Sequence, residues 1–161
     1  MLDSYDFSNG VRGKYAQRFA QGNILFHLNT AVSEDTSPAA FEERARRVLS
    51  AYYGMELAPG SVPGVPKRFD MVSSDLQVIG DAKSYSLVGG ARRPPAKLAT
   101  ISEYIWLLEK TGAPDTFLVF GNDRRVPELW LKDYGSLLSS VAFYFLHDDN
   151  RLELLTARGT R

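Results

Sequence analysis

Residues 67–83 read KRFDMVSSDLQVIGDAK and carry the clearest architectural signal in the chain. Residues 67–72 and 76–83 each predict a β-strand, because both are short runs of largely apolar side chains bounded by polar ones. Ser73, Ser74 and Asp75 supply a turn between the two runs. A connection this short favours an antiparallel hairpin, since parallel strands need a long crossover.

A helix is predicted on each side of this hairpin. Upstream, Ser37 is a suitable N-cap, Pro38 suits the first helical position, and Gly54 is a natural stop. Downstream, residues 95–111 predict the second helix, and Gly112 ends it. The apolar faces consist of Phe41, Ala45, Val48, Leu49 and Tyr52 in the first helix, and of Leu98, Ile101, Ile105 and Leu108 in the second.

The other segments predict further strands and one long loop. Residues 116–120 indicate a strand buried on both faces, and residues 128–132 and 141–146 indicate two more. Residues 23–28 favour a short strand, whereas residues 58–66, rich in proline and glycine, predict a loop. The order of helix, two strands, helix and more strands predicts an α/β fold with a mixed central sheet flanked by helices.

Length and composition exclude several classes of protein. The 161 residues suit one compact body, expected over residues 36–161, with residues 1–35 forming an N-terminal arm. Nineteen basic and nineteen acidic residues balance to zero, which argues against a protein that coats nucleic acid non-specifically. Cysteine is missing, so disulfides, thiolate metal sites and cysteine nucleophiles are excluded.

Nothing in the sequence indicates a membrane or a secretory signal. The apolar run at residues 141–146 is far shorter than the roughly 20 residues that cross a bilayer. The first six residues are acidic and lack an apolar core segment. We therefore expect a cytoplasmic protein with no membrane partner.

Two acids and a lysine in the hairpin could carry chemistry. Side chains alternate along a strand, so Asp81 and Lys83 share a face, and an antiparallel neighbour can bring Asp70 close to Asp81. Two adjacent carboxylates repel, and Mg²⁺ or Mn²⁺ would supply the missing positive charge. A lysine beside the metal could stabilise an anionic transition state or serve as a base. This combination predicts hydrolysis of a phosphodiester.

The triplet of an acid, any residue and a lysine is a weak signal, because it occurs about once by chance in a chain of this size. Its context strengthens it. The triplet lies on a predicted strand, a partner acid lies on the adjacent strand, and Gly80 leaves the neighbouring backbone open. Structural roles for these residues stay the alternative.

Asp70, ten intervening residues and then Asp81, Ala82 and Lys83 resemble the signature of the PD-(D/E)XK nuclease superfamily. The resemblance covers about residues 38–121. It implies a restriction-endonuclease-like fold and a Mg²⁺-dependent nuclease in which Asp70 and Asp81 hold the metal and Lys83 is catalytic.

In that family the first helix carries a glutamate followed by apolar residues three, six and seven positions later. Glu42, with Ala45, Val48 and Leu49, has this spacing, so the resemblance assigns Glu42 to catalysis and to the metal. Glu43 is the alternative helix carboxylate, although it points away from the apolar face.

The chain also departs from the family pattern. Arg68 and Phe69 stand where a proline would precede Asp70, and the second acid is Asp81 rather than the longer glutamate. The superfamily includes inactive proteins, so a nuclease-like module that only binds nucleic acid or a partner protein is the alternative function.

Basic residues indicate where nucleic acid could bind. Arg92, Arg93 and Lys97 lie at the start of the second predicted helix, where the helix dipole attracts phosphate.

Residues 5–15, YDFSNGVRGKY, are similar to a segment of small bacterial antitoxin-like proteins, which implies a bacterial toxin–antitoxin or mobile-element setting. There Arg12 and Lys14 stand among aromatics and suit nucleic acid or a partner protein. The resemblance favours DNA as the substrate, with RNA as the alternative. Cutting both strands of a duplex would favour a homodimer.

Overall fold

The computed structural model describes residues 24–156 of the chain. In this part, seven strands form one mixed sheet in the order β1-β7-β6-β5-β4-β3-β2, as an α/β fold requires. The elements are β1 (Ile24–His27), α1 (Pro38–Tyr53), β2 (Leu57–Ser61), β3 (Arg68–Ser73), β4 (Val78–Tyr85), α2 (Pro95–Lys110), β5 (Asp115–Asn122), α3 (Arg125–Tyr134), the 3₁₀ turn η2 (Gly135–Leu137), β6 (Val141–Leu146) and β7 (Arg151–Leu154).

The predicted hairpin is confirmed, and it lies toward one end of the sheet. β3 and β4 are antiparallel, with Met71 opposite Gly80 and Val72 opposite Ile79. β4 then pairs in parallel with β5, and β5 in parallel with β6. The crossover from β4 to β5 contains α2, as a parallel connection requires.

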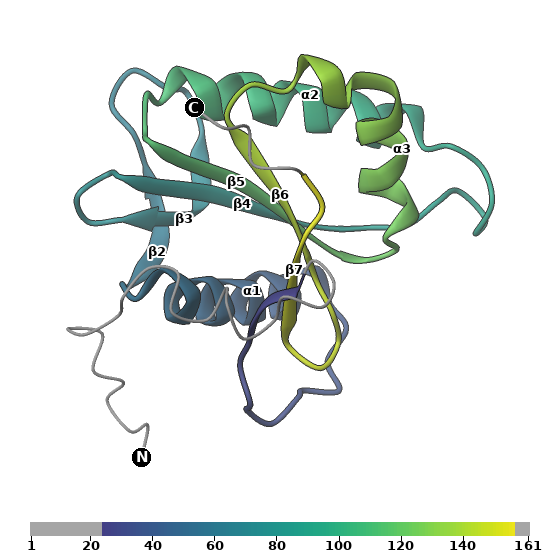
Figure 1. The fold of residues 1–161 in the computed structure, drawn as a ribbon, viewed down its shortest axis with the longest axis horizontal. Coiled ribbons are helices and arrows are strands. Elements are labelled where there is room, and N and C mark those ends of the chain that lie inside the picture. Colours follow the sequence, from purple (N-terminus) through teal and green to yellow (C-terminus); the bar gives the residue numbers. More distant parts are fainter. Residues whose placement is uncertain (1–23, 157–161) are drawn as a thin grey trace.

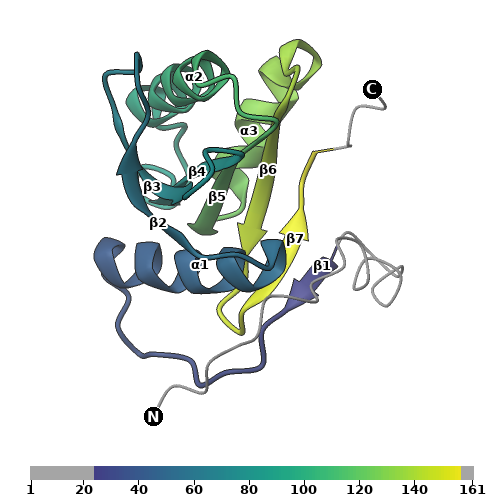
Figure 2. The ribbon, with the colours of Figure 1, turned by 90° about the vertical axis from the view of Figure 1, so that its left-hand side faces the viewer.

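Helices cover both faces of the sheet (Figures 1 and 2). α1 packs on one face, where Val48 and Leu49 join Met71 of β3 and Phe117 of β5 in one core. α2 and α3 pack on the opposite face over a second core. The central strands are therefore buried on both sides, which confirms the interpretation of residues 116–120.

α1 begins and ends where local chemistry indicates. The Ser37 side chain accepts a hydrogen bond from the Ala40 backbone N–H at 3.2 Å, and Gly54 adopts the left-handed conformation with φ 68°. Near its start, the ring of Phe41 packs directly on Gly121 of β5, where an added Cβ would lie 2.2 Å from the ring. The glycine thus allows α1 to approach the sheet closely.

The loop predicted over residues 58–66 is wrong in its first part, because Leu57–Ser61 form β2. This strand lies at the edge of the sheet and pairs only with β3 among the described strands. The register shifts between Ala58 and Gly60, on either side of Pro59. A proline is tolerated there, because an irregular edge strand does not need its missing N–H.

The strand predicted over residues 128–132 is also wrong, because these residues lie within α3. Val126, Pro127 and Trp130 are buried whereas Glu128 is exposed, which fits one face of a helix and breaks the alternation of a strand. The Trp130 ring packs on Phe143 of β6, with ring centroids 5.2 Å apart. Tertiary burial of this one helical face therefore overrides the short apolar pattern.

The short strand predicted at residues 23–28 is present as β1. It pairs in an antiparallel sense with β7, a strand that the sequence did not predict. β1 comes from the predicted arm, whose first 23 residues lie outside the described part of the chain. No helix within residues 24–156 combines the length and the apolarity needed to cross a membrane.

Candidate functional site

Asp70 and Asp81 meet where β3 and β4 stop pairing through their backbones. The Asp70 backbone N–H donates to Oδ1 of Asp81 at 2.9 Å, and the Ala82 backbone N–H donates to Oδ2 of Asp70, also at 2.9 Å. Each carboxylate therefore accepts an N–H from the opposite strand, one position beyond the pair of Met71 and Gly80. The two acids bridge the end of the hairpin.

Gly80 explains how this end of the hairpin is held in place. An added Cβ at Gly80 would lie 2.2 Å from the ring of Phe117, so only glycine leaves room for that ring. Phe117 also stacks on Tyr53 of α1, with ring centroids 5.6 Å apart. The aromatic packing under Gly80 thus fixes β4 immediately before Asp81.

Asp81 is buried and faces two ammonium groups. Its side chain is 0% exposed. Oδ2 accepts a hydrogen bond from Nζ of Lys83 at 2.7 Å and lies 3.1 Å from Nζ of Lys67. Lys83 was predicted to lie here, whereas Lys67 was not singled out from the sequence. The only feature of the sequence that could have indicated Lys67 is its position three residues before Asp70.

Tyr104 of α2 covers both lysines. Its ring centroid lies 3.9 Å from Nζ of Lys83 and 4.1 Å from Nζ of Lys67, which are cation–π distances. Tyr104 was also missed. It lies beside the apolar stripe, between Ile101 and Ile105, where an aromatic residue reads as ordinary packing.

Burial and charge divide the two aspartates. Burial, followed by the charge of Asp81, raises the pKa of Asp70 to about 6. Burial acts in the same direction on Asp81, but the positive charges of Lys83 and Lys67 outweigh it and lower the pKa of Asp81. Burial likewise opposes the charged form of Lys83, yet Asp81 outweighs it and raises the pKa of Lys83. The pair therefore retains like-charge repulsion, most of which is felt at Asp70.

Two carboxylates that still repel each other are a donor set that suits a hard divalent cation. Glu42 does not join them: within residues 24–156, no three or more His, Cys, Asp or Glu side chains gather in a way that could hold a metal. Glu42 is half-buried on α1 and Glu43 is exposed. α1 reaches the site through Arg46, one turn after Glu42, whose Nε donates to the backbone oxygen of Asp70 at 3.2 Å.

The predicted basic residues near α2 lie in different environments. Nζ of Lys97 donates to the backbone oxygen of Ser86 at 3.2 Å and lies 5.5 Å from the ring centroid of Tyr85. Arg93 forms an ion pair with Asp133, and Arg92 is exposed. Arg12 and Lys14 lie outside the described residues.

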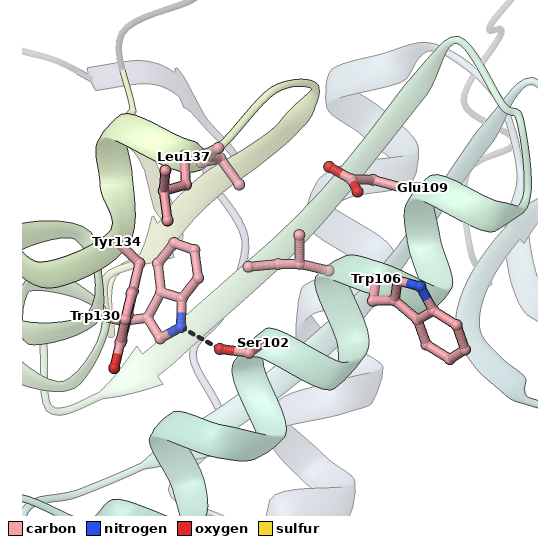
Figure 3. A pocket seen from close by; sticks show the side chains of 8 residues that line it. Ser102, Trp106, Glu109, Trp130, Tyr134 and Leu137 are labelled. Carbon is pink, nitrogen blue, oxygen red and sulfur yellow. Dashed lines mark hydrogen bonds between the residues drawn. The ribbon is translucent and has the colours of Figure 1, made fainter.

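A separate pocket of about 240 Å³ lies between α2 and the segment formed by α3 and η2. Figure 3 shows the indole of Trp130 donating a hydrogen bond to the hydroxyl of Ser102, at 2.9 Å. Glu109, another lining residue, accepts a hydrogen bond from the Ser139 hydroxyl. The lining is mainly apolar and aromatic and resembles packing rather than a catalytic site; it comprises Ser102, Ile105, Trp106, Glu109, Trp130, Tyr134, Leu137 and Leu138.

A second buried carboxylate, Glu153 of β7, lies elsewhere in the fold. Its Oε2 forms an ion pair with Arg124, at the start of α3, and lies 2.8 Å from Nε2 of His147. Burial would raise the pKa of Glu153, but the hydrogen bonds from Arg124 and His147 lower it. This cluster ties α3 to the β6–β7 connection.

Comparisons with protein-family models, with curated proteins and with solved structures found no match to this chain.

Proposed function

We propose that this protein is a Mg²⁺- or Mn²⁺-dependent phosphodiesterase of the PD-(D/E)XK type, acting on DNA as an endonuclease. One observation carries the proposal. Asp70 and Asp81 bridge the open end of a hairpin, and Lys83 touches Asp81 at 2.7 Å from the same strand. Carboxylates that can hold a divalent ion, beside an ammonium that can stabilise negative charge on a phosphate, are groups that such hydrolysis uses.

Asp70 and Asp81 would hold the ion, which supplies Lewis acidity and lowers the pKa of a water molecule. Lys83 would stay protonated, because its pKa is raised. It therefore suits the stabilisation of charge developing on the phosphate better than the role of a base. Since the pKa of Asp70 is about 6, metal binding should strengthen as the pH rises through 6.

The order of elements supports the same proposal. A helix bearing Glu42, a hairpin bearing both acids and the lysine, and a second helix follow one another as α1, β3–β4 and α2. This is the sequence of elements that the resemblance implies. Glu42 matches the helix carboxylate of that pattern by its place on α1, although it does not join the two aspartates.

DNA is proposed as the substrate on the resemblance, with exposed Arg92 and the neighbouring Lys97 as phosphate contacts. Zero net charge implies modest intrinsic affinity for nucleic acid. A second copy of the chain, or a partner protein held by residues 1–35, would then add to binding. RNA is included in the test below.

The second candidate is an inactive, nuclease-like module that binds nucleic acid or a partner protein. The complete burial of Asp81 favours it, because two lysines already neutralise this carboxylate without a metal. Under this candidate, the site is a buried ion-pair network that only holds the hairpin together.

The experiment incubates the protein with plasmid DNA, single-stranded DNA and RNA, each with Mg²⁺ or Mn²⁺. The wild type should cleave DNA, and Lys83→Met should slow cleavage by about a hundredfold or more, the usual cost of losing one charge-stabilising group. Lys110→Met is the matched control, because Lys110 is an exposed lysine at the end of α2, and it should cleave normally. Intact substrates with both metals would favour the inactive module.

A further inference from the structure

We propose that Lys67 is a built-in counter-ion that competes with a divalent metal for Asp81, so that metal binding displaces Lys67 from this carboxylate. The proposal rests on the metal-dependent function above and assigns a regulatory role to a lysine outside the acid and lysine signature. Nζ of Lys67 lies 3.1 Å from Oδ2 of Asp81, on the same oxygen that Lys83 contacts.

Counting charges leads to this role. Two ionised carboxylates, Asp70 and Asp81, face two ammonium groups, Lys67 and Lys83, so the cluster sums to zero. A divalent ion added to this cluster would leave two uncompensated positive charges in a largely buried place, which is costly. If Lys67 moves out, one of these charges is removed. The ion and Lys67 are therefore alternatives at Asp81.

Lys67 is the lysine that can leave. Lys83 lies within β4, where its residue pairs with Phe120 of β5, and its contact with Asp81 is the shorter one. Lys67 precedes the first residue of β3, and its ammonium also donates to the backbone oxygen of Arg68 at 3.2 Å. Its flexible stem can carry the ammonium away without moving a strand.

The aromatic surroundings favour the exchange. Tyr104 contacts both ammonium groups, so it continues to hold Lys83 when Lys67 moves. Lys67 also lies 5.3 Å from the ring centroid of Phe69, which is a weaker contact. Lys67 thus keeps partners other than Asp81, among them the Arg68 backbone oxygen and the Phe69 ring, when a metal takes its place.

The test is a calorimetric titration of the full chain with Mn²⁺ and then Mg²⁺ at pH 7. Lys67→Met should bind about tenfold more tightly than the wild type, because a like charge a few ångströms from the ion is removed. Lys110→Met removes a lysine from the surface and should match the wild type. Asp81→Asn should bind no metal. Lys67→Gln, which keeps an N–H donor without the charge, should behave like Lys67→Met.

Thermal unfolding of the same proteins provides a second measurement. Without metal, Lys67→Met should unfold at a lower temperature than the wild type, because Asp81 loses a counter-ion. Saturating Mn²⁺ should raise its unfolding temperature more than that of the wild type. Equal shifts in the two proteins would count against the competition.

The outcomes separate this inference from the function on which it rests. Metal binding that Asp81→Asn removes, but that neither Lys67 variant strengthens, overturns the role of Lys67 and leaves the metal site in place. Weak binding by the wild type with clearly tighter binding by Lys67→Met supports the competition. Silence in every folded variant overturns the proposed metal-dependent function and this inference with it.

Discussion

Asp81 and Glu153 are both buried carboxylates, and each has two basic partners on a single oxygen. Lys67 and Lys83 contact Oδ2 of Asp81, while Arg124 and His147 contact Oε2 of Glu153. The exposed fraction is 0% for the side chain of Asp81 and 9% for that of Glu153. By burial and pairing alone, the two clusters would receive the same interpretation.

The neighbours of the two acids make the difference. The interactions that oppose burial at Glu153 come from Arg124 and His147 and lower its pKa, so the carboxylate is well compensated. At the hairpin, a second carboxylate lies against the first, and the pKa of Asp70 is raised to about 6. The Glu153 cluster holds elements together, whereas the hairpin cluster keeps two carboxylates in contact, and a divalent ion would relieve their repulsion once it displaces a lysine. A buried acid therefore suggests function when its neighbour is another acid.

The largest expected effect is that of Asp81→Ala, which leaves two largely buried lysines without their partner. Breaking a buried ion pair from one side costs about 3–5 kcal/mol, so this variant should lose that much of its free energy of unfolding. Urea denaturation at pH 7 measures the loss. A loss below about 1 kcal/mol, the size expected for an ion pair at the surface, would contradict this, because it would mean that the two lysines find other partners or water.

Glu153→Gln should cost less, about 1–3 kcal/mol, since glutamine keeps a hydrogen-bonding side chain but loses the charge. Because the pKa of Glu153 is lowered in the folded state, its charge stabilises the protein above the ordinary pKa of a glutamate. This contribution is lost as the pH falls through the folded-state pKa. Urea denaturation at pH 7 and pH 4 should therefore show a smaller gap at pH 4. A constant gap would mean that shape, not charge, holds this cluster.

Asp70→Asn should act in the opposite direction and stabilise the protein by about 1 kcal/mol at pH 7, after allowance for partial exposure. The folded-state pKa of about 6 exceeds the ordinary value of 3.8 for an aspartate, so the folded state holds this proton more tightly than the unfolded chain. Wild-type stability from this group therefore falls as the pH rises from about 4 to 6. Denaturation at pH 7 and pH 5 should show a smaller gain at pH 5. Destabilisation at both values would contradict the repulsion.

The smallest effect is expected at Trp106, which is 57% exposed and belongs to neither cluster. Trp106→Ala should change the free energy of unfolding by less than about 0.5 kcal/mol, as surface substitutions usually do. It should also leave Mn²⁺ binding unchanged. A large effect in thermal unfolding would mean that the pocket beside α2 contributes to the core.

Local chemistry explains which parts of the fold could be predicted. Ser37 and Gly54 bound α1 through contacts within a few residues, and the polar turn at residues 73–75 gives the hairpin. β2 and α3 were predicted wrongly because their environments are set at long range. Pro59 is accepted only because β2 lies at the edge, and Trp130 is buried only because α3 packs on β6.

The same division applies to the candidate site. The hairpin register brings Asp70, Asp81 and Lys83 together, so alternation along strands was enough to place them. Tyr104 reaches the site because α2 packs against the hairpin, and no local sequence pattern contains that contact. Lys67 lies just before β3, and only its long side chain brings its ammonium group to Asp81. Helical spacing favoured Glu42 over Glu43 as the helix carboxylate. Spacing alone does not predict which turn of α1 contacts β3, and in the structure Arg46 makes that contact.

The central claim is that the paired aspartates, and not the other buried acid, attract a divalent cation. A titration with Mn²⁺ followed by electron paramagnetic resonance tests it directly, because bound and free Mn²⁺ give different signals. At pH 7, the wild type and Glu153→Gln should each bind about one ion per chain, and Asp70→Asn should bind far more weakly. Equal binding by the wild type and Asp70→Asn, or no binding by either, would contradict the claim.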